Sequence, residues 1–64
     1  MPNIIINGPL SKDLDKKREF VKELTNAATK FYGITPQAIS VVIKENPPEN
    51  VGVGGELVVD KKTR

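Results

Sequence analysis

The chain has 64 residues, so it forms one domain at most, with a core that is marginal because only about 60% of the unfolded surface is buried at this size. It contains no cysteine and no histidine, which excludes disulfides, thiolate metal sites and Ser-His or Cys-His nucleophile pairs. Ten basic side chains are interleaved with eight acidic ones and there are only three aromatic residues, a composition that does not predict nucleic-acid binding.

The chain opens with "MPNIIIN", in which a proline precedes three isoleucines. Proline has no N–H to give a sheet and is usually found at strand starts or edges, so Pro2 is expected to precede a strand over Asn3–Asn7. Because its apolar residues are consecutive, this strand should be buried on both faces. Two interpretations of Pro2 are open here. It is a strand-start residue with no further role, or, once Met1 is removed, a free secondary amine that does chemistry.

A helix is predicted from about Lys12 to Tyr32. From Phe20 onward its apolar residues recur at helical spacing and form one stripe. Ser11 is the expected N-cap, and Gly33 is the expected left-handed residue after the last turn. Thr35-Pro36 should then start a short helical turn.

A second strand is predicted over Ala38–Asn46, "AISVVIKEN". Strand, helix and strand form a βαβ unit, whose strands should be parallel with a right-handed crossover. The segment "NPPEN" (Asn46–Asn50) is expected to be neither helix nor inner strand. In Gly52–Asp60 the glycines suit a tight turn with positive φ, which predicts a small hairpin or extended arm. Residues 61–64 are expected to form a flexible tail.

One helix covers only one face of a two-stranded sheet, whereas both predicted strands carry apolar side chains on both faces. The uncovered face would be too large an apolar patch for a soluble monomer. The predicted fold is therefore α/β: a single βαβ unit with two parallel strands, one long helix and a short C-terminal hairpin or arm, completed by oligomerisation. Residues 1–64 should form this single domain.

Membrane association is not predicted, because no run of 18 apolar residues is present. The amino terminus also lacks the basic and apolar regions of a signal peptide. The lack of cysteine fits a reducing compartment, so a cytoplasmic location is expected.

Conventional catalytic groups are scarce. The acidic residues of the helix are interleaved with basic ones, as on a solvated helix face, and "GVGGE" does not open a helix as a dinucleotide-binding motif would. The amino terminus remains. An α-amino group has a pKa of about 8, and apolar surroundings or a nearby cation lower it. A neutral amine near neutral pH is a competent general base.

The combination of "MP" before an apolar strand, a helix of this length, "ISVVIKE" and "VGVGGE" resembles the 4-oxalocrotonate (2-hydroxymuconate) tautomerase family, from Pro2 to about Leu57. The resemblance implies βαβ subunits assembled as hexamers and no cofactor. It implies an amino-terminal proline that shuttles a proton between the hydroxyl and a carbon of a dienol. It also implies arginines that bind and polarise the substrate, and an apolar residue before the glycines that keeps the pocket dry.

The resemblance carries over at four positions. Pro2 matches the catalytic proline. Lys12 replaces an arginine after the first strand, which keeps the charge but loses the bidentate fork. Ser40 replaces a second arginine, and Val51 replaces a larger phenylalanine. Pro2 is therefore the predicted catalytic base, and Lys12, Ser40 and Val51 are the predicted substrate-binding residues. Each of these three has a purely structural alternative. Lys12 would be an exposed lysine at the helix start, Ser40 a strand-start residue whose hydroxyl is already hydrogen-bonded, and Val51 a residue of ordinary hairpin packing.

The predicted function is that of a cofactor-free enol–keto tautomerase, an isomerase that acts on a small acidic dienol such as 2-hydroxymuconate. The predicted assembly is a homo-oligomer, with a hexamer expected. Lys12, Lys44 or Arg64, from the same or a neighbouring subunit, could supply the cation that Ser40 lacks. One alternative is another reaction of the superfamily, such as phenylpyruvate tautomerisation. The other is a non-catalytic oligomeric binding module.

Overall fold

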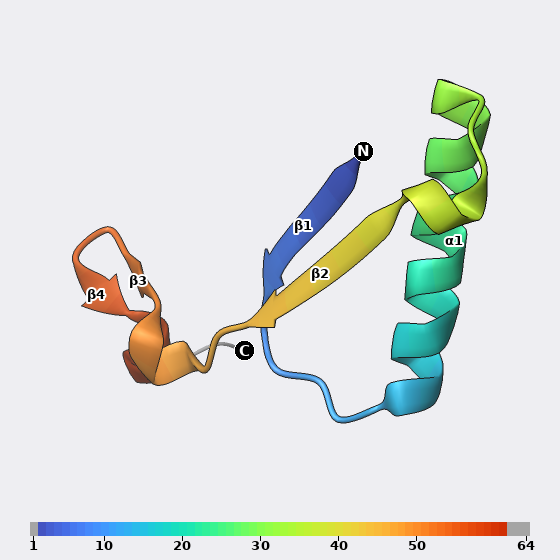
Figure 1. The fold of residues 1–64 in the computed structure, drawn as a ribbon. Helices are drawn as coiled ribbons and strands as arrows, with labels where there is room; N and C mark the ends of the chain where they lie inside the picture. Colours follow the sequence, from blue (N-terminus) through green and yellow to red (C-terminus); the bar gives the residue numbers. More distant parts are fainter. Residues whose placement is uncertain (1, 62–64) are drawn as a thin grey trace.

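The chain forms a β1–α1–β2 unit followed by a C-terminal arm (Figure 1). The computed structural model describes residues 2–61. In it, β1 spans Asn3–Gly8, α1 spans Leu14–Tyr32 and β2 spans Ser40–Glu45. The arm holds two short strands, β3 (Gly52–Val53) and β4 (Glu56–Leu57). Three single 3-10 turns complete the chain: η1 (Pro36–Ala38), η2 (Pro48–Asn50) and η3 (Val58–Asp60). The predicted βαβ unit with a terminal hairpin is confirmed.

The two long strands pair in parallel and in register, from Asn3 opposite Ser40 to Gly8 opposite Glu45. The ladder extends past the last pair, because the Asn46 N–H donates to the Gly8 carbonyl at 2.8 Å. Side chains of paired residues in a parallel ladder lie on the same face of the sheet. Each face therefore carries a matched set of residues from both strands.

The amino-terminal cap of α1 differs from the prediction. Asp13, not Ser11, is the N-cap, and its carboxylate accepts the N–H of Lys16 at 3.1 Å. The helix begins at Leu14, two residues later than predicted, so Ser11 is too far back to reach the free N–H groups of the first turn. At the other end the prediction is confirmed, since Gly33 has φ 68° and donates its N–H to the Thr29 carbonyl at 2.8 Å.

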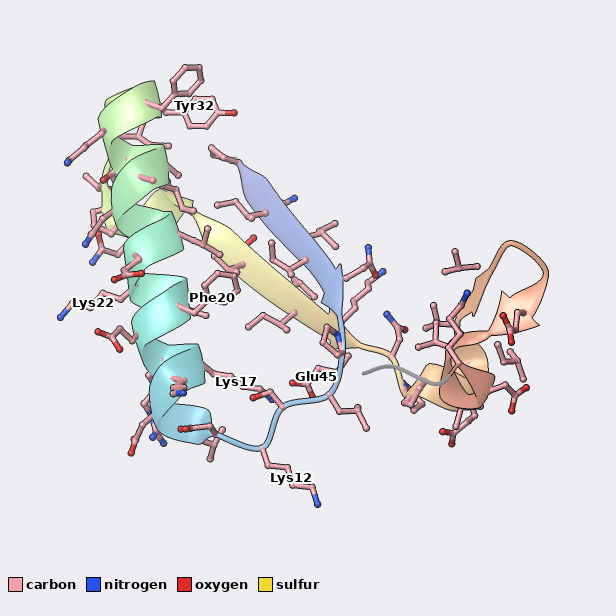
Figure 2. The ribbon with its side chains drawn as sticks, turned by 180° about the vertical axis from the view of Figure 1, so that it is seen from behind. Lys12, Lys17, Phe20, Lys22, Tyr32 and Glu45 are labelled. Carbon is pink, nitrogen blue, oxygen red and sulfur yellow. The ribbon has the colours of Figure 1, made fainter. Side chains whose placement is uncertain are left out.

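Helix α1 covers one face of the β1–β2 sheet. On that face Ile6 and Ile43 share a cleft with Phe20, which projects from the helix toward the strands (Figure 2). On the opposite face, called here the open face, Ile5 is 55% exposed and Val42 is 45% exposed. The predicted burial of both strand faces is therefore not met within one chain, because there is no second layer to cover the open face.

The single chain has little interior of its own. Among residues 2–61, Ala28 is the one buried hydrophobic residue. The radius of gyration is 15.2 Å, against about 11 Å for a compact chain of this length. Figure 1 shows why, since the arm projects away from the sheet and the helix. The single chain is therefore extended rather than compact.

The arm is folded on itself. Gly54 and Gly55 have φ 63° and 83°, which are the conformations that a two-residue hairpin turn requires at both positions. The N–H of Val58 donates to the Val51 carbonyl at 2.8 Å and closes the base of the hairpin. The segment before it was expected to lack helix, but η2 forms one 3-10 turn there because Pro48 stands at its first position, where a missing N–H costs nothing.

Within residues 2–61, neither α1 nor any 3-10 turn has the length and apolar character of a membrane-crossing helix. The predicted removal of Met1 and the predicted tail lie outside the described residues, except for Lys61. Lys61 forms an ion pair with Glu56 at 3.5 Å. Arg64, an alternative cation in the sequence-based prediction, also lies outside them.

Candidate functional site

Two of the predicted site residues lie together at the amino ends of the parallel strands. Pro2 is half-buried and directly precedes β1, and its carbonyl accepts the N–H of Ser40 at 3.2 Å. The Ser40 hydroxyl donates to the Asn3 side-chain carbonyl. These three residues, called here the proline end, place the Pro2 ring nitrogen at the outer limit of the sheet. The Ser40 hydroxyl already has a partner, as the structural alternative for it predicted.

Lys12 and Val51 lie at the opposite end of the sheet. Lys12 belongs to the exposed loop between β1 and α1 and points away from the body of the subunit (Figure 2). β1 has six residues, and a strand rises about 3.3 Å per residue, so roughly 20 Å of strand separates Pro2 from this loop. A single chain therefore does not bring the four predicted residues into one site.

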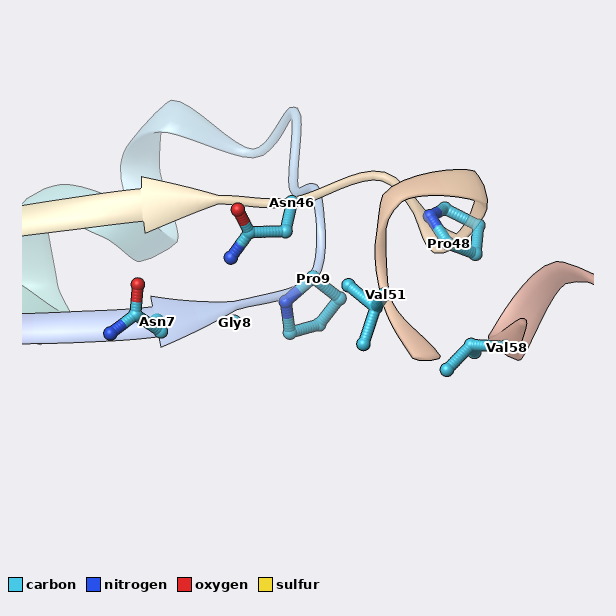
Figure 3. A pocket seen from close by; sticks show the side chains of 7 residues that line it. All are labelled: Asn7, Gly8, Pro9, Asn46, Pro48, Val51 and Val58. Atoms are coloured by element: carbon cyan, nitrogen blue, oxygen red, sulfur yellow. The ribbon is translucent and has the colours of Figure 1, made fainter. Parts of the chain in front are cut away.

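A cleft of about 400 Å³ lies at this second end, between the sheet and the arm (Figure 3). Its lining is mainly apolar, with the side-chain amides of Asn7 and Asn46 as its polar groups. The lining residues are Asn7, Gly8, Pro9, Asn46, Pro48, Val51 and Val58. Val51 is thus a wall of a cleft as well as part of the arm's packing. Its contact with a substrate stays a prediction.

Glu45 and Lys17 form an ion pair that the sequence analysis did not identify. Lys17 Nζ lies 2.5 Å from Glu45 Oε2, and the two side chains are 29% and 23% exposed. The N–H of Ser11 donates to the same carboxylate oxygen at 3.2 Å. The hydrogen bond and charge of Lys17, helped by the Ser11 N–H, lower the pKa of Glu45 below its ordinary value, although partial desolvation opposes the shift.

A sequence signal for this pair exists in retrospect. Glu45 is the last residue of β2, and β1 ends at the same end of the sheet, before the loop that leads into α1. Side chains alternate along a strand, so Glu45 lies on the same face as Ile43, which faces the helix, and its carboxylate meets the first turn of α1, where Lys17 lies. The remaining alternative cation, Lys44, is exposed and belongs to the open-face set of β2. Within residues 2–61, no three Asp, Glu, His or Cys side chains are grouped as metal ligands would be.

Comparison with known proteins identifies the family. A family model described as "Tautomerase enzyme" matches residues 2–61. The chain belongs to the tautomerase family. The resemblance inferred from "MP", "ISVVIKE" and "VGVGGE" is therefore confirmed, and the tautomerase fold accounts for the parallel strands, the single long helix and the terminal hairpin.

Solved structures of tautomerase homologues superpose on this chain over nearly its whole length. DmpI from Archaeoglobus fulgidus is 51% identical, with a TM-score of 0.82 and coverage of 92% of this chain and 100% of that one. A 4-oxalocrotonate tautomerase homologue named TTHB242 is 27% identical, with a TM-score of 0.87 and coverage of 98% and 100%.

A heterohexamer 4-oxalocrotonate tautomerase from Chloroflexus aurantiacus is 22% identical, with a TM-score of 0.84 and coverage of 97% and 100%. At that identity the likeness concerns the fold. The parallel strands, the long helix and the terminal hairpin of this chain thus also occur in a protein of low sequence identity.

Proposed function

We propose that this tautomerase-family chain is a cofactor-free enol–keto tautomerase that acts on a small acidic dienol such as 2-hydroxymuconate, with Pro2 as the general base. The observation that carries the proposal is the position of Pro2. Its carbonyl is held by the Ser40 N–H, so the ring is fixed at the start of β1 while its nitrogen lies at the outer end of the sheet. Membership of the tautomerase family supports proton-transfer chemistry at this end.

The proposed reaction needs one base and no other reactive group. After Met1 is removed, the neutral amine of Pro2 takes the proton of the dienol hydroxyl. The electron pair of that O–H bond then forms the π bond of the new carbonyl. The double bonds shift along the carbon chain of the substrate, and the protonated amine of Pro2 returns its proton to a substrate carbon. No atom is gained or lost and nothing is oxidised. The amine works best as a base when its pKa lies close to the working pH.

The negative charge of the substrate needs a cation or several N–H donors. Lys12 is the proposed cation and Val51 the proposed apolar wall, but both lie roughly 20 Å of strand away from Pro2 in one chain. The proposal therefore places the proline end of one subunit against the loop and cleft of another. A homo-oligomer, with a hexamer expected, supplies this arrangement, and the open face and the projecting arm are the surfaces available to build it.

The direct test is Pro2→Ala, assayed with 2-hydroxymuconate after intact-mass measurement shows that Met1 is absent. A large but incomplete loss of kcat is expected, because a primary amine remains. A form that keeps one residue ahead of Pro2 should lose more, because the ring nitrogen is then an amide. Pro36→Ala, at the start of η1, is the matched control and should keep its activity. Full activity of the Pro2→Ala enzyme would refute the proposal.

Titration of the amine separates the enzyme from a non-catalytic binding module. The Pro2 nitrogen, followed by NMR in the intact assembly, should titrate clearly below the value of about 8 expected for an α-amino group. An unshifted value would favour the binding module.

A phenylpyruvate-type tautomerase is the second candidate. Ser40 is neutral and its hydroxyl is bound to Asn3, so the proline end offers no cation from this position. That arrangement suits a substrate with a single carboxylate. A substrate panel decides between the two, since a preference for phenylpyruvate over 2-hydroxymuconate would select the second. A cytoplasmic location stays a prediction from the sequence.

A further inference from the structure

We propose that Glu45 is a positioning residue that orients the loop carrying Lys12 and so governs how tightly the substrate carboxylate is bound. The inference rests on the proposed function, in which Lys12 is the cation for that carboxylate. Glu45 is not proposed to touch the substrate. It acts through the backbone of the loop between β1 and α1.

The contacts of Glu45 join three parts of the subunit. Glu45 ends β2, its carboxylate accepts the N–H of Ser11 at 3.2 Å, and the same oxygen pairs with Lys17 Nζ at 2.5 Å. Ser11 belongs to the loop and Lys17 to the first turns of α1. The sheet, the loop and the helix are therefore tied together by one side chain, and Figure 2 shows Lys17 and Glu45 pointing toward one another.

Lys12 lies between two residues that these contacts hold. Before it, the N–H of Ser11 is bound to Glu45. After it, Asp13 caps α1 through Lys16 and donates its own N–H to the Ser11 hydroxyl at 3.4 Å. Outside these bonds the loop has no regular structure and is exposed. The backbone of Lys12 is thus held on both sides although its side chain is free to extend outward.

The two lysines, Lys12 and Lys17, differ in whether their charge is paired. The ammonium of Lys17 is engaged by Glu45, so the carboxylate of Glu45 is compensated and does not repel an acidic substrate. Lys12 points away from this pair (Figure 2). Without Glu45 the loop gains conformations, and substrate binding must then order it. Ordering one long side chain corresponds to a factor of about two to ten in affinity.

The experiment compares Glu45→Ala with Asp15→Asn in the intact oligomer. Asp15 also holds a basic residue near the start of α1, since it pairs with Arg18 at 2.8 Å, but among residues 2–61 its side chain forms no hydrogen bond with the loop. Glu45→Ala should raise KM for a carboxylate substrate about two- to tenfold, with kcat little changed, and should reduce the hydrogen-exchange protection of the Ser11 amide. Asp15→Asn should change neither. If Glu45→Ala does not fold, Glu45→Gln serves and should show a smaller rise.

A double variant separates this inference from the proposed function. In a Lys12→Met enzyme, adding Glu45→Ala should cause no further rise in KM, because the group it positions is gone. An equal rise in both backgrounds would overturn the positioning role and leave Lys12 as the cation. An unchanged KM in Glu45→Ala, despite a less protected Ser11 amide, would also overturn it. An unchanged KM in Lys12→Met would instead refute the role of Lys12 itself.

Discussion

The open face of the sheet should hold the assembly together, and replacing its two exposed apolar residues tests this directly. Complete burial of an isoleucine or valine side chain contributes about 1.5–3 kcal/mol. Ile5 retains 55% and Val42 45% of its exposure in the single chain. Burying what remains would contribute roughly 1.5–3 kcal/mol per subunit, and roughly twice that where two subunits bring the same face together.

The variant is Ile5→Thr with Val42→Thr. Threonine is β-branched and keeps the strand preference, so the β1–β2 ladder should survive. At about 1.4 kcal/mol per factor of ten, the loss corresponds to a roughly 100- to 10,000-fold weaker association. Sedimentation velocity over a range of protein concentrations measures the shift toward smaller species, and circular dichroism reports whether the helix persists.

Leu14→Thr is the matched control, because Leu14 is 59% exposed at the first residue of α1 and away from the open face. It should leave the assembly intact. If the double variant sediments like the unmodified protein at every concentration, the open face is not the principal contact. Other exposed apolar residues, on the arm or at the end of α1, would then have to supply that contact.

Three further predictions concern the turn, the ion pair and the proposed cation. Gly55→Ala should destabilise the fold by about 1–2 kcal/mol because Gly55 has φ 83°, whereas Gly8→Ala, with open space at its Cβ, should not, as thermal unfolding would show. The pKa of Glu45 is lowered in the folded state. The stabilisation from its ionised carboxylate is therefore present above the ordinary glutamate pKa of about 4.3 and is lost as the pH falls through the pKa of the folded state. In Glu45→Gln, Tm should fall less steeply as the solution is acidified. Lys12→Met should raise KM for a carboxylate substrate about tenfold or more, while Lys22→Met on the exposed helix face should not, and equal KM values would refute the assignment.

The type and order of the elements, and the family, could be predicted from residues that are close together in the chain. Gly33 ends α1, and Gly54-Gly55 turns the hairpin, because a positive φ is a property of one or two residues and is readable from their identity. Consecutive β-branched residues likewise identified both long strands. The quoted motifs were sufficient to identify the tautomerase family, since they lie in short windows of the chain.

The contacts between distant parts of the chain could not be predicted in this way. Asp13, not Ser11, is the N-cap of α1. The helix start depends on how the preceding loop is held, and that loop is bound by Glu45, a residue far along the chain. Lys12 and Val51 proved to lie at the opposite end of the sheet from Pro2, a distance set by the length and direction of β1. Local preferences are encoded residue by residue, whereas the grouping of distant side chains depends on how the elements pack.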